Sequence, residues 1–544
     1  MTRQQLSLKK INPLYIFLAA VLLNGLFWAV LVPIWHTPDE AAHFANVQNM
    51  AEYGQMHPSG GKDHSQELLL SERLLGTERG SRGTNKFTFH PEYRLDYSNN
   101  VIGPRESEIS NFPKEWRREL VKSESTNYPP VYYFLSAITY KIANNGDLFT
   151  RVFFARLVSV LCLVGIAFTA FKISQLLFPK NMLYQLVLGS MVAFQPMVTF
   201  TSAGVSSDPL SNLLFIAFLY MGARLIISRV SLKNVILAGL ITGIGTWTKP
   251  QFIITVPILY FLIVIKSFKS KSRISSLTKF SFVFGVVYIV SGGFILFQEI
   301  IGRLSANVNP LPYVETTDNV SSTLPAISFT NHLVWTLKHT YAEVLPWYWG
   351  VFDWLGVTLP PVVYRVINRV ILIAVLGFIL KIIFSIKKRD WSKNTQVVAF
   401  MVGFALFYFA VLTWWDWGHF KSVGFSLGIQ GRYFLPAVFP HMLIIFIGLL
   451  TLTPIKFKKY IASLLAIGMI TLNLISLYVV AHAYYDTNNL YNFLIQSSQY
   501  KSVLIKYPFN AIILAIYLFS LIGLIYILTK NVLLKKGINE YKIN

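Results

Sequence analysis

Apolar stretches of about membrane-spanning length recur along the whole of this 544-residue chain. About 20 consecutive apolar residues in a helix cross a bilayer. Charged residues make up 13% of the chain, whereas a soluble protein carries about 25%. The sequence therefore predicts an all-α polytopic membrane protein with about twelve transmembrane helices. The predicted spans are 14–35, 154–177, 182–198, 210–227, 234–248, 251–267, 279–299, 366–386, 395–415, 432–453, 460–482 and 509–529.

The Lys and Arg residues between these spans predict the orientation. Cytoplasmic loops carry an excess of Lys and Arg, and the basic clusters share one side if the short apolar segment 129–143 dips into the membrane and returns. Both termini are then cytoplasmic, and 36–128 and 300–365 are external loops. Because the net charge of +23 is spread over short inter-span segments, it indicates membrane orientation and no nucleic-acid partner.

A helix is predicted over 38–53, directly after the first span. Thr37 and Glu40 have the spacing of a capping box, and Pro38 occupies the first helical position. Gly54 can end the helix. The apolar side of this segment suggests an amphipathic helix that lies along the outer membrane surface.

The acids at the start of this helix allow two interpretations. Glu40 can serve as a cap and Asp39 can complement the helix dipole. Alternatively, Asp39 lies on the same side of the helix as His43, and a carboxylate at the mouth of a membrane cavity can act as a general base or metal ligand. Glu40 and His43 also have the spacing of a helical metal motif, in one isolated copy.

Several charged residues stand where spans reach the external side. Lys249 and Arg432 can hold a phosphate group there, or they can extend to the lipid headgroups. Arg151 and Arg156 allow the same two interpretations. Asp208 precedes the 210–227 span, where it can cap the helix or contribute a second functional carboxylate.

Two aromatic clusters fall at external interfaces. One comprises 347–349 with Asp353, and the other comprises 414–417 with Asp416. Both can belong to the aromatic belt of a membrane protein, or they can stack on sugar rings while the acids accept hydroxyl protons. The sequence leaves both interpretations open.

Several stretches, in this order and spacing, resemble the GT-C superfamily of integral membrane glycosyltransferases. A closer similarity is to a little-characterised bacterial membrane family within that group, which covers nearly the whole chain. Where that family suggests Asn-x-Asp, this chain has Ser206-Ser207-Asp208. The matching stretches are Pro38-Asp39-Glu40 with His43-Phe44, Tyr128-Pro129-Pro130-Val131-Tyr132-Tyr133, Ala155-Arg156-Leu157-Val158-Ser159, Gln195-Pro196, Ser206-Ser207-Asp208-Pro209, Trp247-Thr248-Lys249-Pro250 and Ile429-Gln430-Gly431-Arg432-Tyr433-Phe434-Leu435-Pro436.

The resemblance implies transfer of a sugar from a polyprenyl-phosphate-linked donor to a glycan, lipid or protein of the cell envelope. It also implies a GT-C-like bundle in the bacterial cytoplasmic membrane, with the active site facing the exterior and an external acid that activates the acceptor. Metal use differs within the superfamily, so the resemblance leaves open whether a divalent cation is a cofactor. The implied catalytic residues are Asp39, Glu40 and Asp208, and the implied substrate-binding residues are His43, Arg156, Lys249, Gln430, Arg432 and Tyr433.

Two further expectations concern organisation and the alternatives to an enzyme. We expect an N-terminal transmembrane module over 1–270 and a C-terminal one over 271–544. The sequence contains no Walker A loop, no dinucleotide-binding glycine motif and no Cys/His zinc spacing, which favours a lipid-linked donor over a nucleotide sugar. A flippase or transporter of lipid-linked glycans, or a non-catalytic scaffold, is the alternative function.

Overall fold

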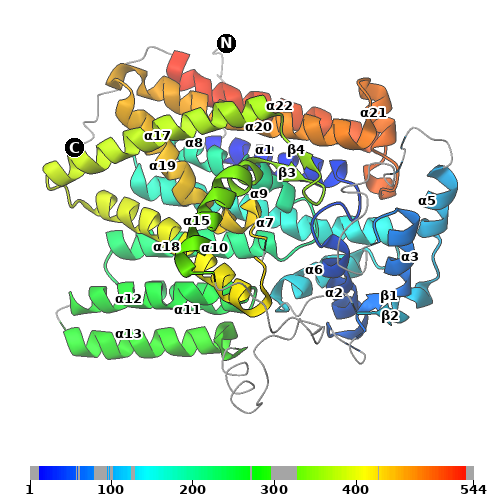
Figure 1. Ribbon diagram of the computed structural model, residues 1–544, viewed down its shortest axis with the longest axis horizontal. Helices are drawn as coiled ribbons and strands as arrows, with labels where there is room; N and C mark the ends of the chain where they lie inside the picture. Colours follow the sequence, from blue (N-terminus) through cyan, green and yellow to red (C-terminus); the bar gives the residue numbers. More distant parts are fainter. Residues whose placement is uncertain are drawn as a thin grey trace, which may run out of the picture.

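The computed structural model is a bundle of helices that run in roughly the same direction (Figure 1). It describes residues 12–56, 58, 62–78, 95, 97, 102–123, 129–269, 272–295, 327–426 and 428–533. Ten helices in these ranges are long and apolar enough to cross a membrane, so the chain is an all-α polytopic membrane protein. Their segments are α1 (Pro13–Leu31), α7 (Leu148–Leu177), α10 (Asp208–Ile227), η3 (Pro250–Ile254) with α12 (Thr255–Phe268), α13 (Arg273–Tyr288) with η4 (Ile289–Gly293), α17 (Pro361–Lys387), α18 (Lys393–Val423), η6 (Gly431–Ala437) with α19 (Val438–Leu452), η7 (Ile455–Phe457) with α20 (Lys458–Tyr485), and α22 (Phe509–Leu533).

The two remaining predicted spans form shorter apolar helices, α8 (Met182–Ala193) and α11 (Leu232–Thr246). The predicted span 182–198 divides because Pro196 has no N–H to continue the hydrogen bonding of α8. Pro196 instead begins α9 (Pro196–Thr201), which the Gln195 side chain caps by accepting from the Val198 N–H at 2.7 Å.

The elements between the spans are short. One end of the bundle, at the right in Figure 1, holds α2, α3, α5, α21 and the strands β1 and β2, and we call it the loop end. The strands pair antiparallel as β1 with β2 and β3 with β4. The bounds are α2 (Glu40–Tyr53), β1 (His64–Ser65), α3 (Gln66–Leu74), α5 (Ile102–Ser110), η2 (Lys114–Arg117), β2 (Leu120–Lys122), α6 (Val131–Ile142), α15 (Phe329–His339), η5 (Thr340–Val344), α16 (Leu345–Trp349), β3 (Val351–Phe352), β4 (Val357–Thr358), α21 (Leu490–Gln496) and η8 (Val503–Ile505).

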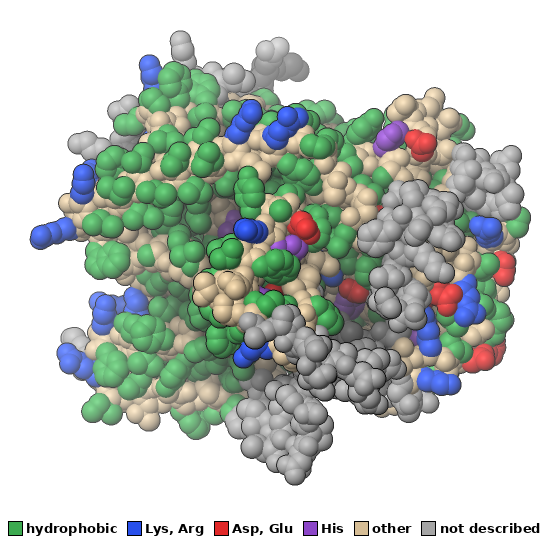
Figure 2. All heavy atoms as spheres, in the orientation of Figure 1, with side chains coloured by type: hydrophobic (Ala, Val, Ile, Leu, Met, Phe, Trp, Pro, Cys, Tyr) green, Lys and Arg blue, Asp and Glu red, His purple; other side chains and the backbone are tan. Residues whose placement is uncertain are grey.

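Acidic side chains are unevenly distributed between the two ends of the bundle. On the face drawn in Figure 2, the loop end shows both acidic and basic side chains, and the charged side chains visible at the opposite end are Lys and Arg. This asymmetry matches the Lys and Arg bias of cytoplasmic loops. The loop end therefore remains our prediction for the external side.

Helix α6 turns back instead of crossing the bundle. It has 12 residues, about 18 Å of helix, which is too short for a bilayer. Its Tyr132 hydroxyl meets Ser159 Oγ at 2.8 Å, and its Tyr140 hydroxyl accepts from Arg151 Nη1 at 2.9 Å. Helix α6 is thus antiparallel to the first part of α7, and the chain is back at the loop end where α7 begins. That this segment dips into the membrane stays a prediction, and Tyr128 of the matching motif lies outside the described residues.

One buried core joins both halves of the chain. The indole of Trp28 in α1 donates to Asn473 Oδ1 in α20 at 3.1 Å, and Tyr517 of α22 donates to Asn24 of α1 at 2.7 Å. Buried polar groups in a membrane bundle are usually satisfied across helices in this way. The division at residue 270 stays a prediction.

Candidate functional site

Four charged side chains from separate segments meet at one place. Arg432 Nη2 lies 3.3 Å from Asp39 Oδ2, and Arg432 Nη1 lies 3.9 Å from Asp208 Oδ2. Lys249 makes a close ion pair with the other oxygen of Asp208. The side chains are 30% (Asp39), 17% (Asp208 and Lys249) and 11% (Arg432) exposed, so the cluster is half-buried with Asp39 outermost. The structure thus brings together two of the acids and two of the bases that the sequence singled out.

The backbone at Asp39 directs its carboxylate away from α2. Asp39 is the N-cap residue in the left-handed conformation (φ 62°), and its side chain makes no cap hydrogen bond. Aspartate is among the few non-glycine residues that adopt this conformation at modest cost. The carboxylate is therefore available to Arg432, which favours the interpretation of Asp39 as a functional acid over a helix-capping one.

The predicted capping box is wrong. Helix α2 begins at Glu40, two residues later than expected, and the Thr37 hydroxyl is buried without a hydrogen-bond partner among the described residues. Both sides of α2 are buried, so it packs within the loop end and does not lie as an amphipathic surface helix. Gly54 ends the helix in the left-handed conformation, as predicted.

Asp208 is the first residue of α10, and its carboxylate does not cap that helix. The N-cap residue is Ser207, which makes no side-chain cap bond, and the Asp208 N–H donates to Ser206 Oγ at 3.2 Å. The Asp208 carboxylate instead faces Lys249, which directly precedes η3. The interpretation of Asp208 as a helix cap is therefore wrong.

Close backbone packing at Gly431 holds Arg432 in place. A Cβ atom at Gly431 would collide with the backbone of Trp347 and Tyr348. We expect Gly431→Ala to shift η6, separate Arg432 from Asp39 and destabilise the protein by about 1–3 kcal/mol. Thermal unfolding in detergent measures the loss. Gly418→Ala in α18 is the control because its Cβ would meet no atom within 4 Å, and equal melting temperatures for the two variants would contradict the prediction.

Glu40 and Arg156 form a fully buried ion pair beside the cluster. Glu40 accepts from Arg156 Nε and Nη2, both at 2.7 Å, and from the backbone N–H groups of Trp35 and Val205, both at 3.0 Å. Arg156 also donates to the backbone carbonyls of Ala29, Val32 and Pro33 at 2.8–2.9 Å. Protein groups occupy the hydrogen-bonding capacity of both side chains, so the pair anchors the start of α2 to α1 and α7.

His43 is close enough to all four charged side chains of the cluster to interact with them electrostatically. Its Nδ1 is 2.7 Å from the Tyr133 hydroxyl of α6. Burial disfavours the imidazolium and lowers the His43 pKa to about 4, although Asp39 and Asp208 act in the opposite direction. His43 is therefore neutral at pH 7 and adds no positive charge to the site.

The depressed pKa of His43 predicts acid lability. Because the unfolded histidine titrates near 6.5 and the folded one near 4, protons favour the unfolded state, and about 3 kcal/mol of stability is lost as the pH falls from about 6.5 to 4. Asparagine can still reach Tyr133 but does not titrate in this range. We therefore expect His43→Asn not to show this loss of stability at low pH. The measurement is the melting temperature of both proteins between pH 7 and pH 4, and parallel profiles would contradict the prediction.

Gln430 directly precedes η6, and Tyr433 follows Arg432 within it. The guanidinium carbon of Arg432 lies 5.6 Å from the centre of the Tyr433 ring, within cation–π range, and the Tyr433 N–H donates to the Gln430 carbonyl at 3.1 Å. Both residues are half-buried. Tyr408 of α18, which lies in an apolar run that offered no signal, is close enough to Asp208 to interact electrostatically.

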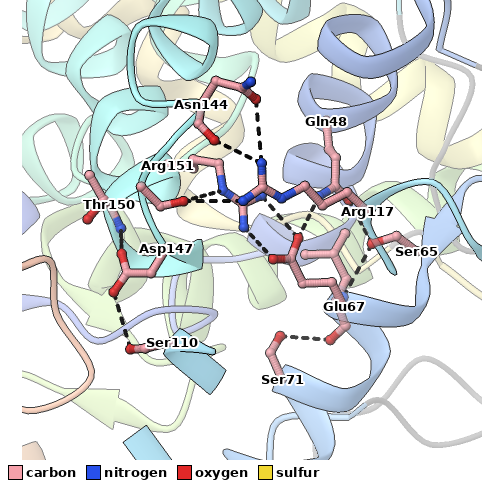
Figure 3. A network of polar contacts seen from close by, with 12 residues as sticks. Gln48, Ser65, Glu67, Ser71, Ser110, Arg117, Asn144, Asp147, Thr150 and Arg151 are labelled. Atoms are coloured by element: carbon pink, nitrogen blue, oxygen red, sulfur yellow. Dashed lines mark hydrogen bonds and ion pairs between the residues drawn. The ribbon is translucent and has the colours of Figure 1, made fainter. Parts of the chain in front are cut away.

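Arg151 anchors the long first loop and does not extend to lipid headgroups (Figure 3). Its guanidinium makes a two-contact ion pair with Glu67 of α3, and both side chains are 1% exposed. Glu67 also accepts from Gln48 of α2 at 2.8 Å. This network fixes α2, and with it Asp39, against α7.

The acids of the two aromatic clusters are engaged by histidines. Asp353 is buried 2.9 Å from His36 Nδ1, and Asp416 lies 3.2 Å from His332 Nε2. No group of three His, Cys, Asp or Glu side chains that could hold a metal ion occurs in the described ranges. Asp39 and Asp208 pair with Arg432 and Lys249.

Comparison with known proteins identifies a family and a weakly similar solved structure. No curated protein sequence matches the chain. The crystal structure of the Archaeoglobus fulgidus oligosaccharyltransferase in the apo form is 12% identical, with a TM-score of 0.35 over 91% of this chain. The chain spans 56% of the length of that protein. Residues 22–440 match the family described as "predicted membrane protein (DUF2142)", a stretch that includes every residue of the cluster, and the chain belongs to this family.

Proposed function

We propose that this protein is a membrane glycosyltransferase that uses a polyprenyl-phosphate-linked sugar and transfers it to a glycan, lipid or protein of the cell envelope. The observation that supports the proposal is the convergence of Asp39, Asp208, Lys249 and Arg432 at the loop end of an apolar bundle. Such a donor requires cations for its phosphate next to a bilayer for its chain.

The chemistry assigns different tasks to the acids and the bases. Asp39, the most exposed acid of the cluster, takes the proton of the acceptor hydroxyl or amine as the acceptor atom bonds to the anomeric carbon. The bond from that carbon to the phosphate oxygen breaks, and its electron pair leaves with the phosphate. Lys249 and Arg432 stabilise the charge that grows there. Direct displacement of this kind inverts the anomeric configuration.

The remaining candidate residues support these groups. Asp208 orients Lys249 and Arg432, and Gln430 and Tyr433 flank the phosphate site. The hydrogen bonds of Glu40 and Arg156 are all made to other protein groups, and burial keeps His43 neutral. We therefore assign these three as positioning residues.

Reconstituted protein with a labelled polyprenyl-phosphate sugar tests the function. We expect transfer to a membrane acceptor, and we expect Lys249→Met to lower kcat/KM for the donor by about 10²–10³-fold because one charge-stabilising donor is lost. Lys456→Met, an exposed lysine between α19 and α20, is the matched control and should leave the rate unchanged. Movement of the carrier across the membrane without product would support the flippase instead.

A further inference from the structure

The guanidinium of Arg432 is shared between two carboxylates and still has a free donor. Nη2 faces Asp39 and Nη1 faces Asp208. The third edge, Nε–H, is buried and has no hydrogen-bond partner among the described residues. A buried, unpaired N–H is costly and marks a place where a ligand or water can accept.

The charges of the cluster balance before any substrate binds. Asp39 and Asp208 offset Lys249 and Arg432, while His43 is neutral. An entering phosphate therefore meets no uncompensated cation in the described part of the site. To bind strongly it must draw one cation away from a carboxylate, because an anion left beside two paired carboxylates is repelled.

The geometry indicates which carboxylate gives way. Asp208 retains the close ion pair with Lys249 if Arg432 moves, and it is only 17% exposed. Asp39 is 30% exposed, so water can solvate its released charge at a lower cost. The separation of 3.3 Å between Asp39 and Arg432 is long for a charge-assisted hydrogen bond, which are about 2.7–2.9 Å.

We infer that the donor phosphate and Asp39 compete for Arg432, so that donor binding releases Asp39 to accept the proton of the acceptor. This inference rests on the proposed function and adds an order of binding to it. A guanidinium stabilises the ionised form of a neighbouring carboxylate, and the carboxylate becomes a better proton acceptor once the cation moves away. The base is thus strengthened only when a donor is seated, and the acceptor is activated second.

Phosphate affinity tests the competition without measuring activity. The probes are a short-chain polyprenyl monophosphate, inorganic phosphate and the corresponding polyprenol, titrated into the purified full-length protein in detergent. We expect Asp39→Asn to bind the polyprenyl phosphate about tenfold more tightly, because the competing carboxylate is gone, and to bind the polyprenol unchanged. If Asp39→Asn also binds inorganic phosphate about tenfold more tightly, the phosphate group alone competes with Asp39. If only the affinity for the polyprenyl phosphate rises, the competition requires the lipid-linked phosphate.

Two controls make the result decisive. Asp486→Asn removes a 92% exposed aspartate that also has a positive φ, and it should leave every affinity unchanged. In an Arg432→Gln background, Asp39→Asn should no longer tighten phosphate binding. Equal or weaker affinity for the lipid phosphate in Asp39→Asn, or an equal gain for the polyprenol, would overturn the inference. If Asp39→Asn does not fold, Asp39→Ser, which removes the same charge, takes the place of Asp39→Asn in each comparison.

The affinity result and the transfer result are separable. Tighter phosphate binding in Asp39→Asn without transfer from any polyprenyl-phosphate sugar would uphold the competition and contradict the proposed function. Transfer by the unmodified protein with no affinity gain in Asp39→Asn would uphold the function and overturn the competition.

Discussion

Replacement of Asp39 by asparagine should lower the rate of glycosyl transfer by about 10²–10⁴-fold, the contribution of a positioned general base. The amide has nearly the shape of the carboxylate but cannot take the proton of the acceptor. Asparagine also tolerates the left-handed backbone that residue 39 adopts, at φ 62°, so α2 should still begin at Glu40. The measurement is transfer from a labelled polyprenyl-phosphate sugar by reconstituted protein.

The matched control for this prediction is Asp486→Asn. Asp486 is another aspartate in the left-handed conformation, and it ends α20 with its side chain 92% exposed. The same chemical change there should leave the transfer rate within about twofold of the parent. Full activity in Asp39→Asn, with a melting temperature equal to that of the parent, would remove Asp39 as the proposed base.

Replacement of Arg156 by methionine should lower the free energy of unfolding by about 3–5 kcal/mol, because it strands the buried Glu40 carboxylate. Arg156 is 3% exposed and Glu40 is fully buried, so no water replaces the lost guanidinium. The carbonyls of Ala29, Val32 and Pro33 lose their donors as well. Denaturant or thermal unfolding in detergent micelles measures the change.

Two comparisons separate the buried pair from an ordinary ion pair. Arg118→Met breaks the pair between Arg118 and Glu52, in which the arginine is 63% exposed, and should cost at most about 1 kcal/mol. The double variant Glu40→Gln/Arg156→Met should be more stable than Arg156→Met alone, since the stranded charge is gone. A loss below about 1 kcal/mol in Arg156→Met would contradict the assignment of this pair as an anchor.

The sequence predicted the spans well and the helix starts less well. Long apolar runs correspond to helices because backbone groups in a bilayer must bond within their own segment. Helix α7 begins at Leu148, six residues before the predicted 154, because Asp147 caps it and Arg151 is held by Glu67. The capping box failed for a similar reason, since Glu40 is drawn to Arg156, 116 residues away in sequence.

The sequence by itself determined the fold class, the returning segment at 129–143 and the residue types available to the cluster, because hydropathy and the cost of intramembrane charge are local properties. Only the tertiary structure decided which charges are neighbours. It brought Arg432 next to Asp39, 393 positions away in sequence, and paired Lys249 with Asp208. It also gave the adjacent acids different surroundings, since Asp39 belongs to the half-buried cluster and Glu40 to the buried ion pair with Arg156. The physical reason is that an ion pair depends on distances of a few ångströms, and helix packing sets those distances.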